Sequence, residues 1–305
     1  MIKLILLSGF LGAGKTTLMT NILTSFADEK VGLIVNEFGE TGVDGPLLAK
    51  TGVQMTELNN GSIFCACIKD HFLRSLIEMS KMDISYLFIE PTGLADPSEM
   101  DKILETISPM LEKSYDYRGV VCVVDAETFP KLSQVLPALT RQVEYCGAAI
   151  INKADLVDEA KIEAITTQIS KLNPNCEIII TSHCQLDARA LAKRLAPAAK
   201  APQDSTNTPE TRLYSTVLKP KCQVPVEPLR QFVKKLSTNA YRIKGFLPSK
   251  NGIIAVNAVG GVLNIDPWTE ENPPIGLVII SAIGVGIISR ITEAMCDELK
   301  GILNL

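Results

Sequence analysis

Nine residues near the amino terminus have the types and the spacing that bind an oligophosphate. The segment Gly9-Phe10-Leu11-Gly12-Ala13-Gly14-Lys15-Thr16-Thr17 matches G-x-x-x-x-G-K-[ST] and follows an apolar run over residues 2–7. Glycine lets backbone N–H groups approach phosphate oxygens, because no Cβ blocks the way. We expect Lys15 to reach the β- and γ-phosphates and Thr16 to offer its hydroxyl to Mg²⁺. This phosphate loop predicts a nucleoside triphosphate site with these candidate contacts: Gly9, Gly12, Ala13, Gly14, Lys15, Thr16 and Thr17.

A second motif indicates which base the nucleotide carries. Asn152-Lys153-Ala154-Asp155 ends a β-branched apolar run and matches N-K-x-D. The Asp155 carboxylate can accept hydrogen bonds from N1–H and the exocyclic amine of guanine, a donor pair that adenine lacks. We expect Asn152 to brace the loop and the stem of Lys153 to lie against the base. The motif favours guanine, and Ser182, at the end of a later β-branched run, is a further candidate contact.

Two segments between these motifs carry the acidic residues and glycines of switch loops. Glu37 lies in the segment 36–44 directly after an apolar run, although a plain surface turn would look similar. Glu90 ends another apolar run, where its carboxylate can hold Mg²⁺ or its water, and Gly93 can give an N–H to the γ-phosphate. The candidate catalytic residues are therefore Lys15, Glu37 and Glu90, and the candidate Mg²⁺ ligands are Thr16 and Glu90.

A pair of cysteines raises a separate question of metal binding. Cys65 and Cys67 are separated by one residue, so they are either soft metal ligands or ordinary small side chains. Their thiolates could supply two ligands for Zn²⁺ or a similar ion, and His71 could supply a third. Glu37, Glu40 or a second subunit would complete such a shell. The spacing alone does not decide between the two interpretations.

The order of apolar runs predicts the fold class. β-branched runs alternate with helix-like stretches, which predicts an α/β domain with a mostly parallel sheet covered on both faces. Ligands of such sheets bind at the carboxyl ends of the strands, where each nucleotide motif lies. The predicted strands are residues 2–7, 31–35, 86–89, 120–124, 148–151 and 177–180.

A change of composition divides the chain. We predict a P-loop GTPase domain over 1–196, a linker rich in Pro, Ala, Lys, Ser and Thr over 197–211, and a smaller α+β domain over 212–305. In this last part, the pattern predicts clustered antiparallel strands, one helix over 227–236 and a helix that continues to the carboxyl terminus.

Composition excludes several classes of protein. The 305 residues carry a formal net charge of −4, so we expect no nucleic-acid partner. The 8 cysteines are scattered rather than framed, which predicts reduced thiols and a cytoplasmic location. The apolar amino terminus lacks a cleavage site and runs into the phosphate loop, and no apolar run reaches the ~20 residues that a membrane helix needs. We expect no membrane partner.

The motifs taken together resemble a known family. GFLGAGKTT, NEFGE, a glycine-then-cysteine loop, EPTGLADP and NKAD occur in the order seen in CobW-type GTPases, relatives of the maturation GTPases HypB and UreG. The resemblance covers essentially the whole chain. It implies a GTPase domain that dimerises around nucleotide, the family's C-terminal domain, and GTP-dependent delivery of a metal or a metal-bearing cofactor.

The chain departs from the family pattern at three points. The family usually has C-x-C-C after the glycine, whereas this chain has Ser62-Ile63-Phe64-Cys65, so that only Cys65 matches and Cys67 is an addition. Pro91 replaces the usual Ser or Thr and removes an N–H beside the γ-phosphate. The family's histidine-rich tracts are absent, since the chain has 2 histidines.

The resulting hypothesis is a slow GTPase that acts as a metallochaperone or metallocofactor-insertion factor. Its cofactors would be GTP or GDP and Mg²⁺, with Zn or Co as cargo. Its partners would be a client metalloenzyme or corrinoid protein and a second copy of itself when nucleotide is bound. The alternative is a regulatory protein that senses GTP and binds no transition metal. A small-molecule kinase is disfavoured, because N-K-x-D selects guanine.

Overall fold

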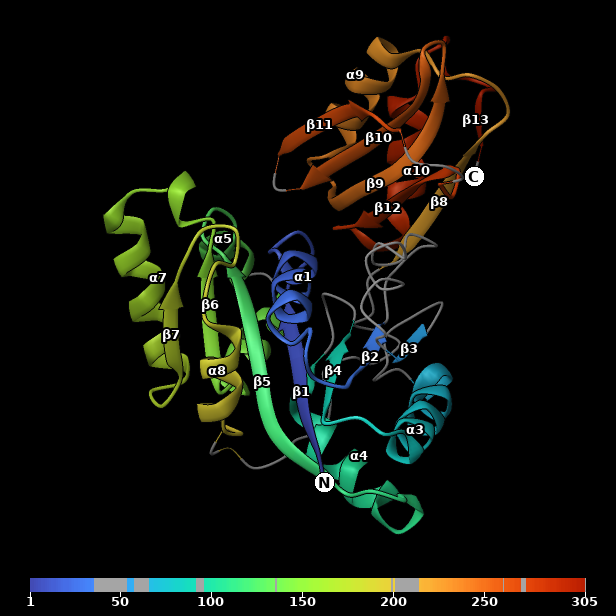
Figure 1. Ribbon diagram of the computed structural model, residues 1–305. Coiled ribbons are helices and arrows are strands. Elements are labelled where there is room, and N and C mark those ends of the chain that lie inside the picture. The colour runs from blue at the N-terminus through green and yellow to red at the C-terminus, as the bar shows by residue number, and fades with distance from the viewer. Residues whose placement is uncertain are drawn as a thin grey trace. The chain divides into compact units, whose positions relative to one another are not determined.

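The computed structural model describes residues 1–35, 54–57, 66–91, 96–134, 136–198, 200, 214–259, 261–269 and 273–304, with the backbone alone for 54–57 and 66–69. The chain divides into two compact units, Met1–Glu210 and Thr211–Leu305. Figure 1 shows the elements of each.

The first unit is built on a seven-stranded sheet in the order β3-β2-β4-β1-β5-β6-β7. Each neighbouring pair is parallel, which confirms the predicted α/β class. The four-residue strand β3 was not predicted, because QMTE shows neither an apolar run nor a clear alternation. The strands are β1 (Ile2–Gly9), β2 (Val31–Val35), β3 (Gln54–Glu57), β4 (Tyr86–Glu90), β5 (Tyr115–Asp125), β6 (Ala148–Asn152) and β7 (Glu177–Ile180).

In the described part of this unit, helices lie between most pairs of successive strands, as parallel pairing requires, and a last helix follows β7. They are α1 (Lys15–Ser25), α3 (Ala66–Lys81), α4 (Met100–Ile107), α5 (Phe129–Leu132), α6 (Pro137–Glu144), α7 (Glu159–Leu172) and α8 (Ala188–Arg194). The side chains of Asp158 and Asp187 accept hydrogen bonds from Lys161 N and Ala190 N, which caps α7 and α8.

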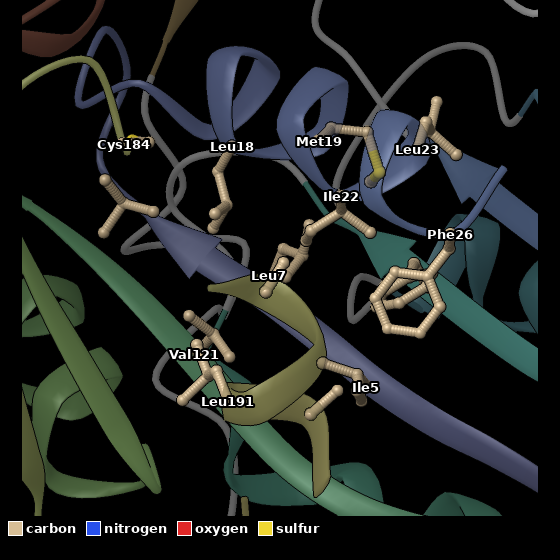
Figure 2. Packing of buried hydrophobic residues seen from close by; sticks show 14 of the residues in the cluster. Ile5, Leu7, Leu18, Met19, Ile22, Leu23, Phe26, Val121, Cys184 and Leu191 are labelled. Carbon is tan, nitrogen blue, oxygen red and sulfur yellow. The ribbon is translucent and has the colours of Figure 1, made fainter. Parts of the chain in front are cut away.

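One face of the sheet is covered by α1 and α8. Apolar residues recur at helical spacing through α1 and its C-cap, from Leu18 to Phe26, and are buried. They pack on Ile5, Leu7 and neighbouring strand residues, with Leu191 of α8 in the same cluster (Figure 2). This packing fixes the axis of α1, and with it the direction in which the amino end of that helix points.

The carboxyl ends of the central strands lie together at one edge. Val35 of β2 is in register with Glu90 of β4, and Asp125 of β5 is in register with Asn152 of β6. Gly9 of β1 is in register with Val123. The phosphate loop, Glu90 and the N-K-x-D motif therefore lie at the same edge of one sheet.

The second unit has an antiparallel six-stranded sheet in the order β11-β10-β9-β12-β8-β13. One face is buried under α9 and α10, which contact each other. Its elements are β8 (Ser215–Pro220), α9 (Val226–Leu236), β9 (Ala240–Ser249), β10 (Gly252–Val259), β11 (Val262–Pro267), β12 (Gly276–Ser281), α10 (Ile287–Ala294) and β13 (Leu303–Asn304).

The prediction of a helix up to the carboxyl terminus was wrong. Helix α10 ends at Ala294, because the next residue, Met295, is extended. The chain then turns and Leu303 pairs with Pro220 of β8. Leu299 and Leu303 are buried in the core of this unit, so tertiary packing decides the path of residues 295–304.

Candidate functional site

The phosphate loop connects β1 to α1. A Cβ on Gly9, whose φ is +135°, would lie closer than 3.0 Å to the carbonyl oxygen of Val123, so this position requires glycine. Lys15 Nζ donates hydrogen bonds to the carbonyls of Gly9 at 2.9 Å and Phe10 at 3.2 Å. Thr16 and Thr17 are exposed in the first turn of α1. The amino end of α1 is thus open to an anion, with Lys15 held inside the loop.

Asn152 connects the N-K-x-D motif to the phosphate loop. It is 3% exposed, and its Nδ2 donates a hydrogen bond of 2.9 Å to the carbonyl of Ala13. Gly14 has a φ of +113°, and a Cβ there would lie closer than 3.0 Å to that same Nδ2. The glycine therefore makes room for Asn152, and Asn152 holds the loop as a brace.

The same asparagine holds a third segment, the loop after β7. Asn152 Oδ1 accepts a hydrogen bond of 2.9 Å from Cys184 N. Asn21 Nδ2 on α1 donates to the carbonyls of His183 at 3.1 Å and Cys184 at 2.9 Å. His183 and Cys184 have φ values of +54° and +51°, uncommon for residues other than glycine, and these hydrogen bonds hold them there.

Asn21 and Cys184 were missed by the sequence analysis. The Cys184 side chain is fully buried between the phosphate loop and α1 (Figure 2), and burial raises the pKa of its thiol to about 12. It is therefore a packing residue rather than a reactive one. A lone asparagine inside an amphipathic helix carried no signal that distinguishes it from a surface residue.

Lys153 forms an ion pair that the sequence did not reveal. Its Nζ lies 2.6 Å from Asp125 Oδ2, with the two side chains 31% and 3% exposed. The other oxygen of Asp125 accepts hydrogen bonds from Glu127 N and Thr128 N. Lys153 itself has a φ of +62°. Asp125 could have been singled out from the sequence, because it is an acidic residue directly after the predicted strand 120–124. Its ion pair fixes the direction of the Lys153 stem.

Asp155 and Ser182 lie side by side at the outer end of this edge. Asp155 N donates a hydrogen bond of 3.2 Å to Ser182 Oγ. Hydrogen bonding by the Ser182 hydroxyl, together with the backbone N–H of Asp155 and the nearby His183, lowers the pKa of the Asp155 carboxyl. Asp155 is exposed. An ionised carboxylate is therefore presented to solvent beside a hydroxyl.

Glu90 is buried at the carboxyl end of β4, next to β1 and β2 in the sheet. Glu37, Glu40, Cys65 and Gly93 lie outside the described residues, as does the side chain of Cys67. His71 is exposed on α3. Among the described residues, no group of three or more His, Cys, Asp and Glu side chains could hold a metal ion.

The parallel sheet, the glycine loop and the helix that begins at Lys15 define the class of protein, a P-loop nucleotide-binding protein. Residues 3–180 match the sequence model of a protein family, the CobW/HypB/UreG nucleotide-binding domain. The chain belongs to this family, as its motifs predicted.

Individual relatives are similar over part or most of the chain. The zinc chaperone YjiA of Escherichia coli (strain K12) is 33% identical over 193 residues, which cover 61% of this chain and 59% of that protein. The chain thus matches less than two thirds of that relative's length. The zinc-regulated GTPase metalloprotein activator 1 of Dictyostelium discoideum is 26% identical over 329 aligned positions, covering 88% of this chain and 68% of the relative.

A solved structure shows the same fold. The crystal structure of the Zn(II)-bound YjiA GTPase from E. coli superposes with a TM-score of 0.50 at 22% identity, and covers 97% of this chain and 99% of the other. In the described part of this chain, no helix combines the length and the apolar character needed to span a bilayer.

Proposed function

We propose that this protein binds GTP, hydrolyses it slowly, and uses the nucleotide state to control delivery of a metal ion to a client protein. The main structural support is the pair of hydrogen bonds made by the Asn152 side chain. They join the phosphate loop and both predicted base-contacting loops into one unit. A family that includes zinc chaperones and zinc-regulated GTPases supports both the GTPase activity and zinc as cargo.

The site residues have distinct roles in this proposal. Lys15 and the loop amides neutralise the triphosphate, with Gly9, Gly12, Ala13, Gly14 and Thr17 lining the loop. Asp155 reads guanine, while Lys153 and Ser182 flank the base. Gly93 donates to the γ-phosphate, and Glu37 orders the attacking water.

Mg²⁺ fits the oxygen donors at this edge. Thr16 offers a hydroxyl at the start of α1. Glu90 offers a carboxylate at the end of β4, the strand directly beside β1 in the sheet. Hydroxyl and carboxylate oxygens are the ligands that Mg²⁺ takes beside phosphates. When bound, the ion would offset the charge that develops on the transferred phosphoryl group.

The cargo part of the proposal rests on the cysteine segment. Cys65 and Cys67 would supply thiolates for Zn²⁺, and the two switch segments around them would order this pair only when the γ-phosphate is bound. The client would be a metalloenzyme or a corrinoid protein. A second copy of the chain, assembled when nucleotide is bound, would complete the metal shell.

Metal titration in both nucleotide states tests this function. We expect Zn²⁺ to bind more tightly with a non-hydrolysable GTP analogue than with GDP, with a coupling of about 1–3 kcal/mol. A Cys65→Ser/Cys67→Ser double variant should lose this site, whereas Cys222→Ser, which changes an exposed cysteine of the second unit, should retain it. Equal Zn²⁺ affinity in all samples would favour the alternative, a GTP-sensing regulatory protein.

A further inference from the structure

Two thiols meet at the end of the sheet opposite the nucleotide edge. Cys146 lies two residues before β6 and Cys176 lies directly before β7, and their Sγ atoms are 3.3 Å apart. A disulfide bond has an S–S length of 2.03–2.05 Å, so the two sulfurs would need to close by about 1.3 Å. Rotation of the two side chains about χ1 moves their sulfurs without a change in the fold.

The backbone around the pair is held by a buried side chain. Asn173, 8% exposed, donates from Nδ2 to the carbonyls of Val143 at 3.0 Å, Glu144 at 3.3 Å and Cys146 at 2.8 Å. Its own carbonyl accepts a hydrogen bond of 3.2 Å from Cys176 N. One residue therefore fixes the positions of both cysteines, which keeps the two thiols together at high effective concentration.

The two thiols differ in their surroundings. Cys146 is 1% exposed and contacts the thiols of Cys122 and Cys176, and these neighbours and burial raise its pKa. Cys176 is partly exposed, and the hydrogen bond from Cys146 lowers its pKa. A thiolate is the attacking form of cysteine, so Cys176 is the reactive partner and Cys146 lies behind it.

We propose that Cys146 and Cys176 are an oxidisable dithiol that forms an intramolecular disulfide when the protein meets a peroxide. The Cys176 thiol releases its proton, and the thiolate attacks one peroxide oxygen; the O–O bond breaks, which gives a sulfenic acid and a hydroxide that takes up the released proton as one water. Cys146 sulfur then attacks Cys176 Sγ, the S–O bond breaks, and the hydroxide leaves with the proton of Cys146 as a second water. The two thiols lose two electrons and the peroxide gains them.

The disulfide would tie β6 to β7 at their amino ends. Strand β6 ends at Asn152, and β7 ends two residues before Ser182. The bond would therefore link covalently the two strands that support the proposed base-contacting loops. The three sulfurs of Cys122, Cys146 and Cys176 are not part of any group that could hold a metal ion in the described residues. The 3.3 Å separation of the Cys146 and Cys176 sulfurs is the observation that supports oxidation to a disulfide.

Peptide mapping of the full chain tests the proposal without reference to its activity. The reduced protein is treated with hydrogen peroxide, blocked with a maleimide and digested with trypsin. We expect a linked pair of peptides, 142–153 and 172–189, and a loss of two of the 8 titratable thiols. Because peptide 172–189 also contains Cys184, fragmentation must place the bond at Cys176. No linked pair, or a bond from Cys146 to Cys122 or Cys184, would overturn the proposal.

Variants test the order of the two steps. Cys146→Ser should leave the Cys176 sulfenic acid without a partner, so that dimedone labelling of Cys176 rises at least fivefold over the unmodified chain. Cys176→Ser should abolish both label and bond, and Cys222→Ser should change neither. Equal dimedone labelling of Cys176 in the unmodified chain and in Cys146→Ser would overturn the assignment of Cys146 as the resolving residue. Melting curves of each reduced variant identify any that fail to fold, and the unmodified chain alone still gives the peptide map.

Discussion

The Asn152 side chain donates a hydrogen bond of 2.9 Å to the carbonyl of Ala13, 139 residues earlier in the chain. Both groups are buried, and the other end of the same side chain accepts from Cys184 N. A buried amide that satisfies partners on two loops ties their positions together, because either loop can shift only by leaving a polar group unpaired. The proposed phosphate loop and the proposed base-contacting loop after β7 are therefore mechanically linked through Asn152.

Replacement of Asn152 by alanine should weaken GTP and GDP alike. The change leaves a buried carbonyl and a buried N–H without partners, at about 1–3 kcal/mol each. We expect at least a tenfold rise in the Kd for both nucleotides, measured by calorimetry, together with a lower Tm. Asn257→Ala, at an exposed position on β10, is the control and should leave both quantities unchanged. If Asn152→Ala binds nucleotide as the parent does, the proposed brace has no energetic role.

A pair of glycine variants separates backbone strain from steric conflict. Gly14 and Gly252 have φ values of +113° and +106°, but an added Cβ meets Asn152 Nδ2 at Gly14 and nothing within 4 Å at Gly252. Gly252→Ala should lower the free energy of unfolding by about 1–2 kcal/mol, the cost of placing alanine in a left-handed backbone conformation. Gly14→Ala should cost more and should also abolish GTP binding. Denaturant melts and nucleotide titrations measure both effects, and equal losses in the two variants would contradict the role assigned to Asn152.

The ion pair of Asp125 with Lys153 should contribute to stability and to base selectivity. Asp125→Ala removes the acceptor of two backbone N–H groups and the partner of Lys153, so we expect a loss of about 1–3 kcal/mol in the free energy of unfolding. Asp297→Ala breaks an exposed pair with Lys300 and should change little, since exposed pairs are screened by water. The ratio of GTP to ATP affinity should fall in Asp125→Ala alone. A ratio that stays at the parent value would show that Lys153 needs no such support.

Asp155→Asn should exchange guanine for xanthine specificity. The amide cannot accept two hydrogen bonds from guanine N1–H and its amine, whereas it can donate to the carbonyl that xanthine has in place of that amine. We expect the Kd for GTP to rise at least tenfold and that for xanthosine triphosphate to fall. Because the pKa of Asp155 is lowered, the parent carboxylate stays ionised as pH falls, and GTP affinity should be flat between pH 6 and 8. Equal binding of ATP and GTP by the parent would refute the guanine assignment.

Lys15→Ala should abolish hydrolysis and most of the affinity for triphosphate. The loop amides alone cannot neutralise the phosphate oxygens that the ammonium compensates. Lys15 Nζ donates hydrogen bonds to the carbonyls of Gly9 and Phe10, which position it at the loop. Glu90→Ala should chiefly lower turnover. Phosphate release and nucleotide titration measure the two effects, with Lys300→Ala as the exposed control. Turnover within twofold of the parent in both Lys15→Ala and Glu90→Ala would contradict the catalytic roles.

Sequence alone determined the features that depend on local pattern. The glycine spacing of the phosphate loop, the N-K-x-D motif and the alternation of β-branched runs with helical stretches each encode a local conformation, because backbone sterics and side-chain periodicity act over a few residues. From these followed the α/β class and the family, both of which hold.

Tertiary structure alone decided which distant residues meet. Strand β3 forms by pairing with β2 although QMTE has little strand character of its own, and the chain after Ala294 turns so that Leu299 and Leu303 reach a core. Asn21, Asp125 and Cys184 contribute to the site, and Cys146 meets Cys176, only because sheet register and helix packing bring them together. Hydrogen bonds and sulfur contacts between residues so far apart depend on the packed core, and no spacing along the chain encodes them.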